Sequence, residues 1–292
     1  LLIQNMAHCG QDINYYGYKN NIYAYNKRRC GVNILEVKNL KVYFNVPGGI
    51  VKAVDDVSFD IEKGKVFGIV GESGSGKTLT ALSILKLILW PGNIAGGSVI
   101  FDGLDILKLD EKDLRGIRGS KISIVFQEPA GSFNPVFTVG EQIVETIINH
   151  QGIDGNKAKY LALEYLNRVH IDEAKRIFYD YPHQLSGGTK QRAMIAMALV
   201  NSPELVILDE PTTALDVTIQ AQILDLLKEI IEKEKLSILF ISHDFGIVSR
   251  MCDRVAVMRK GIIVETGDTK QVLDDPRNEY TASLLRSVKA LL

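Results

Sequence analysis

The stretch Val66-Phe67-Gly68-Ile69-Val70-Gly71-Glu72-Ser73-Gly74-Ser75-Gly76-Lys77-Thr78 decides the fold. Its first five residues form an apolar run, which is typical of a strand buried on both faces. The next eight follow the pattern Gly-x-x-x-x-Gly-Lys-Thr, in which backbone N–H groups wrap the phosphates of a nucleotide. An apolar pattern over 79–89 then predicts a helix, whose N-terminus would point at the same anion. The sequence therefore predicts a strand, a phosphate-binding loop and a helix, in that order.

Further apolar strands alternate with helical patterns on the carboxyl side of this unit. Strands are predicted at 122–126, 205–208 and 237–241, and helices at 139–150, 158–169, 173–178, 189–200 and 217–233. On the amino side, strand patterns cover 34–37, 41–44 and 51–61. This alternation predicts an α/β fold with a largely parallel sheet and helices on both faces. We expect residues 128–184 to form a helical insert that leaves the main core.

The composition of the chain argues against several classes of function. The chain has 292 residues, 46% hydrophobic and 24% charged, with a formal net charge of -1, which gives no electrostatic argument for nucleic acid. Cys9, Cys30 and Cys252 are too widely spaced for a metal site, and we expect free thiols. No apolar run approaches the roughly 20 residues of a membrane-spanning helix. The best candidate, 84–90, is stopped by Pro91, and we interpret it as part of the buried helix after the loop.

The first 33 residues differ from the rest of the chain. Leu1–Asn33 is rich in Asn and Tyr, shows no sustained periodicity and lacks the pattern of a secretory signal. We expect this extension to be disordered and assign it no function.

Four polar residues next to the predicted core suit phosphate chemistry. Lys77 would lie along the β- and γ-phosphates, and the Thr78 hydroxyl would bind Mg²⁺. Asp209 ends an apolar strand and so places a carboxylate at the edge of the sheet where ligands bind, to hold Mg²⁺ directly or through a water. Glu210 follows it and precedes a proline, and an adjacent carboxylate suits the general base that activates a water.

The segment Leu185-Ser186-Gly187-Gly188-Thr189-Lys190-Gln191 lies between the phosphate loop and the Asp-Glu strand. Ser is a good helix N-cap, so Ser186 can be explained simply as the start of the helix at 189–200. With the phosphate loop and Asp209-Glu210, however, the segment makes the chain resemble the ATP-binding cassette (ABC) ATPases, from about Ile34 to about Gly267.

The resemblance implies an ABC-type P-loop domain with a mainly parallel core sheet, an antiparallel β-subdomain and a helical subdomain at 128–184. It implies that Ser186, Gly187 and Gly188 contact the γ-phosphate of ATP held by a second subunit. Thr189 stands where the usual motif has Gln.

The same resemblance implies roles for four more residues. Gln127 would reach Mg²⁺ and the attacking water, His243 would contact the γ-phosphate, and Asp216 would lie in the loop along the dimer interface. Phe44 occupies the place of the aromatic that stacks on adenine. Tyr43 is the alternative, since neighbouring strand residues face opposite ways.

Further motifs resemble one branch, the ATPase subunits of oligopeptide, dipeptide and nickel importers: Phe126-Gln127-Glu128-Pro129, Tyr181-Pro182-His183-Gln184 and Asp209-Glu210-Pro211-Thr212-Thr213-Ala214-Leu215-Asp216. Residues 280–285 resemble the start of that branch's C-terminal extension, so we expect 268–292 to be a short helical extension. No cysteine follows Cys252, so we expect no iron–sulfur centre there.

This branch implies ATP-driven import of peptides, with ATP and Mg²⁺ as cofactors and dimer closure as the power stroke. The implied partners are a second, related but non-identical ABC ATPase, two transmembrane permease subunits and, indirectly, an extracytoplasmic substrate-binding protein. The implied location is peripheral, on the cytoplasmic face of the cell membrane. Nickel import is the alternative. A non-transport ABC ATPase of repair or translation is disfavoured by the short insert, the single cassette and the balanced charge.

Overall fold

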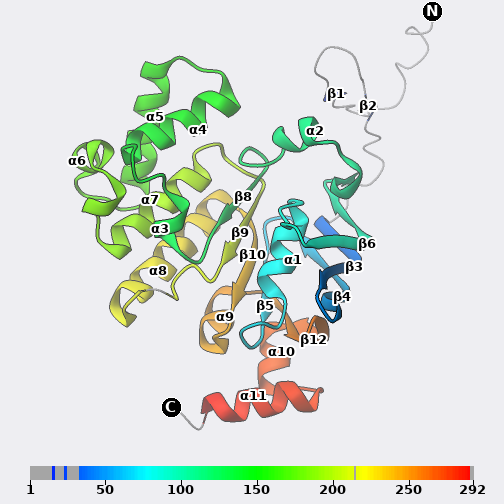
Figure 1. Cartoon of the computed structure of the whole chain (residues 1–292). Coiled ribbons are helices and arrows are strands. Elements are labelled where there is room, and N and C mark those ends of the chain that lie inside the picture. The colour runs from blue at the N-terminus through cyan, green and yellow to red at the C-terminus, as the bar shows by residue number, and fades with distance from the viewer. Residues whose placement is uncertain (1–14, 17–22, 25–32, 214, 290–292) are drawn as a thin grey trace, which may run out of the picture. The chain divides into compact units, whose positions relative to one another are not determined.

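The computed structural model describes residues 15–16, 23–24, 33–213 and 215–289 (Figure 1). The chain divides into two compact units, Leu1–Val32 and Asn33–Leu292. In the first, β1 (Tyr15–Tyr16) pairs antiparallel with β2 (Tyr23–Ala24). Of the segment 1–33 expected to be disordered, Asn33 begins a strand of the second unit, and apart from β1 and β2 the other residues lie outside the described ones, as do Cys9 and Cys30.

The second unit is built on a six-stranded sheet. Its order is β12 (Ile262–Asp268), β11 (Arg254–Arg259), β5 (Val66–Val70), β10 (Ser237–Ser242), β9 (Leu205–Asp209) and β8 (Ile122–Val125). Every pairing is parallel except that of β11 with β12. β5, β9 and β10 are buried along their whole lengths, as their apolar runs predict. The predicted α/β class with a mainly parallel sheet is confirmed.

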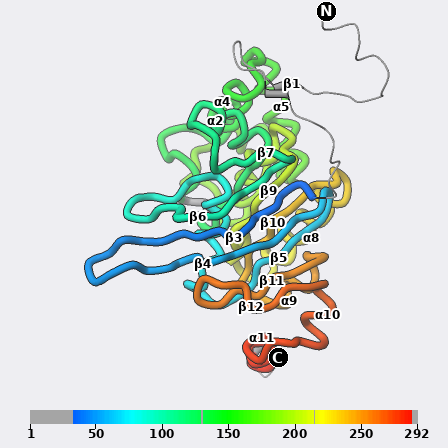
Figure 2. The backbone as a smooth tube through the Cα atoms, turned by 90° about the vertical axis from the view of Figure 1, so that its right-hand side faces the viewer, coloured from blue at the N-terminus to red at the C-terminus, as the bar shows by residue number. Residues whose placement is uncertain are grey.

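A second, antiparallel sheet follows the order β4 (Gly49–Glu62), β3 (Asn33–Val46), β6 (Gly92–Phe101) and β7 (Leu104–Asp105). β3 and β4 form one long hairpin (Figure 2). The strand patterns predicted at 34–37 and 41–44 both belong to β3, and the pattern at 51–61 belongs to β4. β6 is not apparent from the sequence because it contains three glycines and few buried apolar side chains. The short η1 (Ile106–Lys108) and α2 (Glu111–Arg115) follow this sheet.

The helix after the phosphate loop, α1 (Lys77–Ile84), is shorter than the sequence predicts. Lys86 has a left-handed backbone (φ 51), and Arg118 donates from Nε to the Leu85 carbonyl oxygen at 2.8 Å. These features end the helix, and Pro91 disfavours helical backbone at the residue before it. Leu89 and Trp90 are 82% and 93% exposed. The prediction of a buried helix over 84–90 is therefore wrong beyond the first residues of that range.

The helical insert comprises α3 (Pro129–Ser132), α4 (Val139–Gln151), α5 (Gly155–Arg168), α6 (Ala174–Tyr179) and η2 (Pro182–Gln184). Thr138 and Glu141 form a capping box at the start of α4. In Figure 1 the green α4, α5 and α6 gather beside the sheet rather than upon it. The helices lie close to their predicted positions, and the limits 128–184 for the subdomain stay a prediction.

The remaining helices follow the helical insert in the chain. They are α7 (Gly187–Leu199), α8 (Val217–Glu234), α9 (Phe245–Met251), α10 (Thr269–Asp274) and α11 (Glu279–Lys289). Among the described residues, no helix combines the length and apolarity needed to cross a bilayer. Cys252 has a free, buried thiol.

The core consists of two apolar layers, one on each face of the central sheet. Along β10, Ile238 and Phe240 belong to the layer beneath the helices, whereas Leu239 and Ile241 belong to the layer beneath the antiparallel sheet. Both faces of the strand are therefore covered, which explains why its sequence is continuously apolar instead of alternating.

The contact between α4 and α6 predicts the effect of one methyl group. A Cβ atom built on Gly140 would lie 2.4 Å from Cγ of Phe178, so Gly140→Ala must displace the ring. We expect the variant to lower the free energy of unfolding by about 1–3 kcal/mol, the usual cost of overpacking, measured by urea denaturation. Gly155→Ala is the matched control, because no atom lies within 4 Å of its added Cβ. Equal unfolding midpoints for the two variants would contradict the packing argument.

Candidate active site

The predicted phosphate loop runs from the end of β5 to the start of α1. Gly74 and Gly76 have left-handed backbone, with φ of 75° and 105°, which side chains other than glycine's adopt at a cost. Gly71 is needed for space, because a Cβ there would lie 2.2 Å from the Met258 carbonyl oxygen. Ser73 and Gly74 are exposed, whereas the Ser75 side chain is buried and its Oγ has no hydrogen-bond partner.

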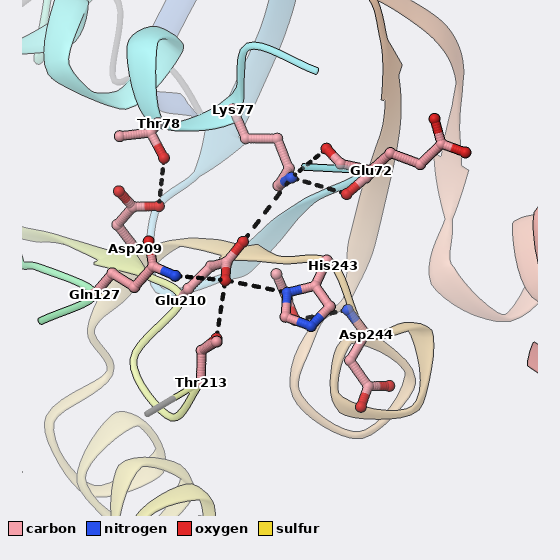
Figure 3. Close-up of polar contacts among 11 residues, drawn as sticks. Glu72, Lys77, Thr78, Gln127, Asp209, Glu210, Thr213, His243 and Asp244 are labelled. Atoms are coloured by element: carbon pink, nitrogen blue, oxygen red, sulfur yellow. Dashed lines mark hydrogen bonds and ion pairs between the residues drawn. The ribbon is translucent and has the colours of Figure 1, made fainter. Parts of the chain in front are cut away.

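Lys77 reaches across the inside of this loop (Figure 3). Its Nζ donates to the carbonyl oxygens of Gly71 and Glu72, at 2.8 and 2.9 Å, and lies 4.0 Å from Oε1 of Glu210. The side chain is only 5% exposed. Burial lowers the pKa of Lys77, while the carboxylates of Glu210 and Asp209 act in the opposite direction. Carbonyls and carboxylates therefore hold the Lys77 cation inside the loop.

Thr78 and Asp209 form an oxygen pair at the carboxyl edge of the sheet. Thr78 Oγ1 donates to Asp209 Oδ1 at 3.1 Å. Asp209 is 2% exposed, and burial raises its pKa while the hydrogen bond from Thr78 lowers it. No cluster of three His, Cys, Asp or Glu side chains suited to a metal exists in the described part of the chain. Two protein oxygens nevertheless fit Mg²⁺, which keeps several waters and takes its other ligands from phosphates.

Glu210 is the centre of the hydrogen-bond network in Figure 3. Its backbone is left-handed (φ 46), and its N–H donates to the Ile241 carbonyl oxygen at 3.0 Å. Oε2 accepts from Gln127 Nε2 at 3.2 Å and lies 3.1 Å from Nδ1 of His243. The structure thus brings together three residues predicted from distant parts of the sequence.

Thr213 completes this network and was not among the predicted site residues. Its Oγ1 donates to Oε2 of Glu210 at 2.9 Å. The sequence offers one signal, a hydroxyl three residues after the carboxylate. The two side chains meet, however, only because the chain turns directly after β9.

Ser186, Gly187 and Gly188 lie at the N-terminus of α7. Ser186 Oγ accepts from the Thr189 N–H at 3.2 Å, which confirms the N-cap interpretation. Asp216 caps the neighbouring α8 by accepting from the Ile219 N–H at 3.0 Å. The two helix starts touch, since a Cβ on Gly188 would lie 2.7 Å from Cγ2 of Ile219. Among the described residues, no hydrogen bond or ion pair joins them to the phosphate loop, and their contact with nucleotide stays a prediction.

Phe44 and Tyr43 face different surroundings on β3. The Phe44 ring packs at the start of β6, where a Cβ on Gly92 would lie 2.6 Å from it. The Tyr43 hydroxyl donates to Asp55 Oδ1 at 2.6 Å. The adenine-stacking role of Phe44 stays a prediction.

The sequence matches the family model described as "ABC transporter" over residues 54–213. The chain belongs to the ABC transporter family.

Curated relatives include the oligopeptide transport ATP-binding protein OppD of Bacillus subtilis (strain 168), 48% identical over 88% of this chain and 72% of that protein. The dipeptide transport ATP-binding protein DppD of the same organism is 46% identical, over 88% of this chain and 77% of that protein. The peptidoglycan transport ATP-binding protein YejF of Agrobacterium fabrum is 52% identical over 86% of this chain; the matched part is 46% of YejF, so the chain spans about half of it.

Solved structures agree with this family. A dimeric post-hydrolysis state of the ATP-binding cassette MJ0796, bound to ADP and Pi, has a TM-score of 0.72 and 30% identity, over 80% of this chain and 98% of that one. CbiO1 of Clostridium perfringens, part of the transporter complex cbiONQ, also has a TM-score of 0.72, with 28% identity over 90% of this chain and 96% of that one. ATP hydrolysis is thus the activity of this ABC ATPase.

The Thr213 contact leads to a kinetic prediction. Thr213→Val removes the hydroxyl but keeps the shape of the side chain, so Glu210 loses one of the three groups at Oε2. We expect kcat for ATP hydrolysis to fall about three- to tenfold, the effect of one hydrogen bond, with little change in KM. Thr266→Val is the control, because the Thr266 hydroxyl makes no hydrogen bond within the described part of the chain. A change in KM alone would show that Thr213 acts on binding instead.

Proposed function

We propose that this chain is the ATP-hydrolysing subunit of a peptide importer. The observation that carries the proposal is the position of Glu210. Its carboxylate is held by Gln127, Thr213 and His243, and it lies 4.0 Å from Lys77. These contacts support a role for Glu210 as general base next to the proposed phosphate site.

The residues divide the chemistry among themselves. The loop amides and Lys77 bind the β- and γ-phosphates, and Phe44 stacks on adenine. Thr78 and Asp209 would hold Mg²⁺, with Gln127 near it, and the bound ion would supply positive charge to offset that of the phosphates. Glu210 orients a water and accepts its proton as the water oxygen bonds to the γ-phosphorus and the bond to ADP breaks. A base in this role contributes about 10²–10⁴-fold to the rate. His243 orients Glu210 and the γ-phosphate.

Ser186, Gly187 and Gly188 act on a second subunit. Their helix N-terminus suits an anion, yet among the residues that the structure describes no hydrogen bond or ion pair joins it to the phosphate loop. We infer that two related ATPase subunits close around ATP, with Asp216 at their interface; MJ0796, a relative in fold, is described as dimeric. Moving a two-state equilibrium from 1:99 to 99:1 takes about 5.5 kcal/mol of differential binding, within reach of two nucleotides that gain charge-assisted hydrogen bonds on closure.

Closure would act on two permease subunits, fed by an extracytoplasmic substrate-binding protein. The chain would then sit peripherally on the cytoplasmic face of the cell membrane. Peptides are the substrate class we favour over nickel, since OppD and DppD are named for oligopeptide and dipeptide transport.

The proposal is tested first at Glu210. Glu210→Gln keeps the size of the side chain but removes the proton acceptor, so we expect ATP binding to persist while turnover falls at least about 100-fold. Both are measured on the purified chain and on its complex with the partner ATPase and permeases. Lys77→Met should instead lose ATP binding, and Glu232→Gln on α8 serves as the charge-matched control. Normal turnover of Glu210→Gln would refute the role of this carboxylate.

The substrate class needs a separate measurement. In vesicles containing the assembled importer, we expect ATP-dependent uptake of labelled dipeptides and oligopeptides, but not of Ni²⁺. Uptake of nickel without uptake of peptide would replace the proposed substrate while leaving the ATPase chemistry intact.

A further inference from the structure

The start of α11 is fixed to the edge of the central sheet. The Glu265 carboxylate of β12 accepts from the backbone N–H groups of Arg277 and Asn278, at 2.8 and 3.1 Å. Asn278 Oδ1 in turn accepts from the N–H of Tyr280 at 2.9 Å. The backbone that carries Tyr280 therefore has little freedom to move away from the sheet.

The end of β11 contacts both the phosphate loop and Tyr280. On the loop side, the Met258 carbonyl oxygen packs against Gly71, and Gly261 donates from its N–H to the Ser75 carbonyl oxygen at 2.9 Å. On the other side, the guanidinium of Arg259 lies over the Tyr280 ring, 4.4 Å from its centroid. A cation this close to an aromatic face is attracted to it. Arg259 thus places the Tyr280 ring beside the loop.

The hydroxyl of Tyr280 is buried, and it forms no hydrogen bond of acceptable geometry among the described residues. Glu72, the residue after Gly71, is the acidic group that faces it. Burial raises the pKa of Tyr280, and the Glu72 carboxylate adds to that increase, while Arg259 opposes it. Figure 3 shows the Glu72 side chain pointing away from Lys77, while the Glu72 carbonyl oxygen accepts from Lys77 Nζ. Buried hydroxyl groups ordinarily have a partner, and the flexible Glu72 side chain is the acidic group that can supply one.

We propose that Tyr280 is a positioning residue for the phosphate loop: its hydroxyl donates a hydrogen bond to the Glu72 carboxylate and holds this negative charge away from the bound triphosphate. The inference rests on the proposed function, because it assigns that loop to ATP. Arg259 supports the same arrangement by packing on the ring. Tyr280 touches neither nucleotide nor the reacting atoms, and it acts through the conformation of the loop, which Glu72 shares with Lys77.

The first test needs no nucleotide. Tyr280→Phe keeps the ring on Arg259 and removes only the hydroxyl. In the full chain we expect amide hydrogen exchange across 71–78 to become about threefold faster or more, while exchange in β9 and β10 is unchanged. Tyr160→Phe is the matched control, since Tyr160 is 73% exposed and lies on α5. Unchanged exchange in the loop of Tyr280→Phe would overturn the inference.

The second test measures the coupling between Tyr280 and Glu72. With MgATP as the probe, we expect Tyr280→Phe to weaken binding about three- to tenfold, the range for one hydrogen bond, and to raise KM more than it lowers kcat. In a Glu72→Gln background the same substitution should change binding less than about twofold, because the charged acceptor is gone. Equal effects in both backgrounds would show a merely structural role of Tyr280 and overturn the inference. A wild-type chain that binds no ATP would refute the proposed function instead, and the exchange result would still decide the role of Tyr280.

Discussion

The parallel register of three strands is the constraint on which the rest of this site depends. Ser242 of β10 pairs with Val70 of β5, and Ile241 pairs with Asp209 of β9. The three strands therefore end at the same level, and whatever follows each of them meets the others. The phosphate loop, Glu210 and His243 are those following residues, which explains how segments more than 170 residues apart in the sequence, at Gly71 and His243, form one network.

Charge balance at this edge explains the detailed arrangement. Lys77, Asp209 and Glu210 have side chains 5%, 2% and 12% exposed, and such charges are rarely buried without partners. Two unit charges 4 Å apart attract by about 4 kcal/mol at an effective dielectric constant of 20, so the distance from Lys77 to Glu210 offsets part of the cost of burying both. The two carboxylates outnumber the one cation. This excess negative charge would suit the proposed Mg²⁺, and the hydrogen bonds from Gln127 and Thr213 stabilise the Glu210 carboxylate.

Residues could be predicted from the sequence where the pattern of their immediate neighbours in the chain indicates their position. The glycine spacing predicted the loop, and an apolar strand followed by two carboxylates predicted Asp209 and Glu210 at the sheet edge. The features that sequence analysis missed depend on contacts between distant segments. The end of α1 is set by Arg118, which caps it from outside the helix, and the hydrogen bond of Thr213 depends on a turn. Gln127 and His243 were assigned through family resemblance, since neither a lone amide nor a lone imidazole identifies a role by itself.

In the proposed mechanism, the separation between the start of α1 and the start of α7 determines how ATP binding can do work. One chain presents the phosphate loop at the start of α1 and Ser186 at the start of α7, and no hydrogen bond joins the two within the described residues. If the two helix ends contacted the same triphosphate within one chain, ATP would make all its contacts without bringing two chains together. Its binding free energy could then not move a partner subunit. If each chain offers two halves of a site to a second chain, as we propose, ATP gains its full set of contacts only on closure, and those added contacts favour the closed state. The Ser186 cap fixes the start of α7, so this helix end is preorganised and the free energy of the added contacts can favour closure.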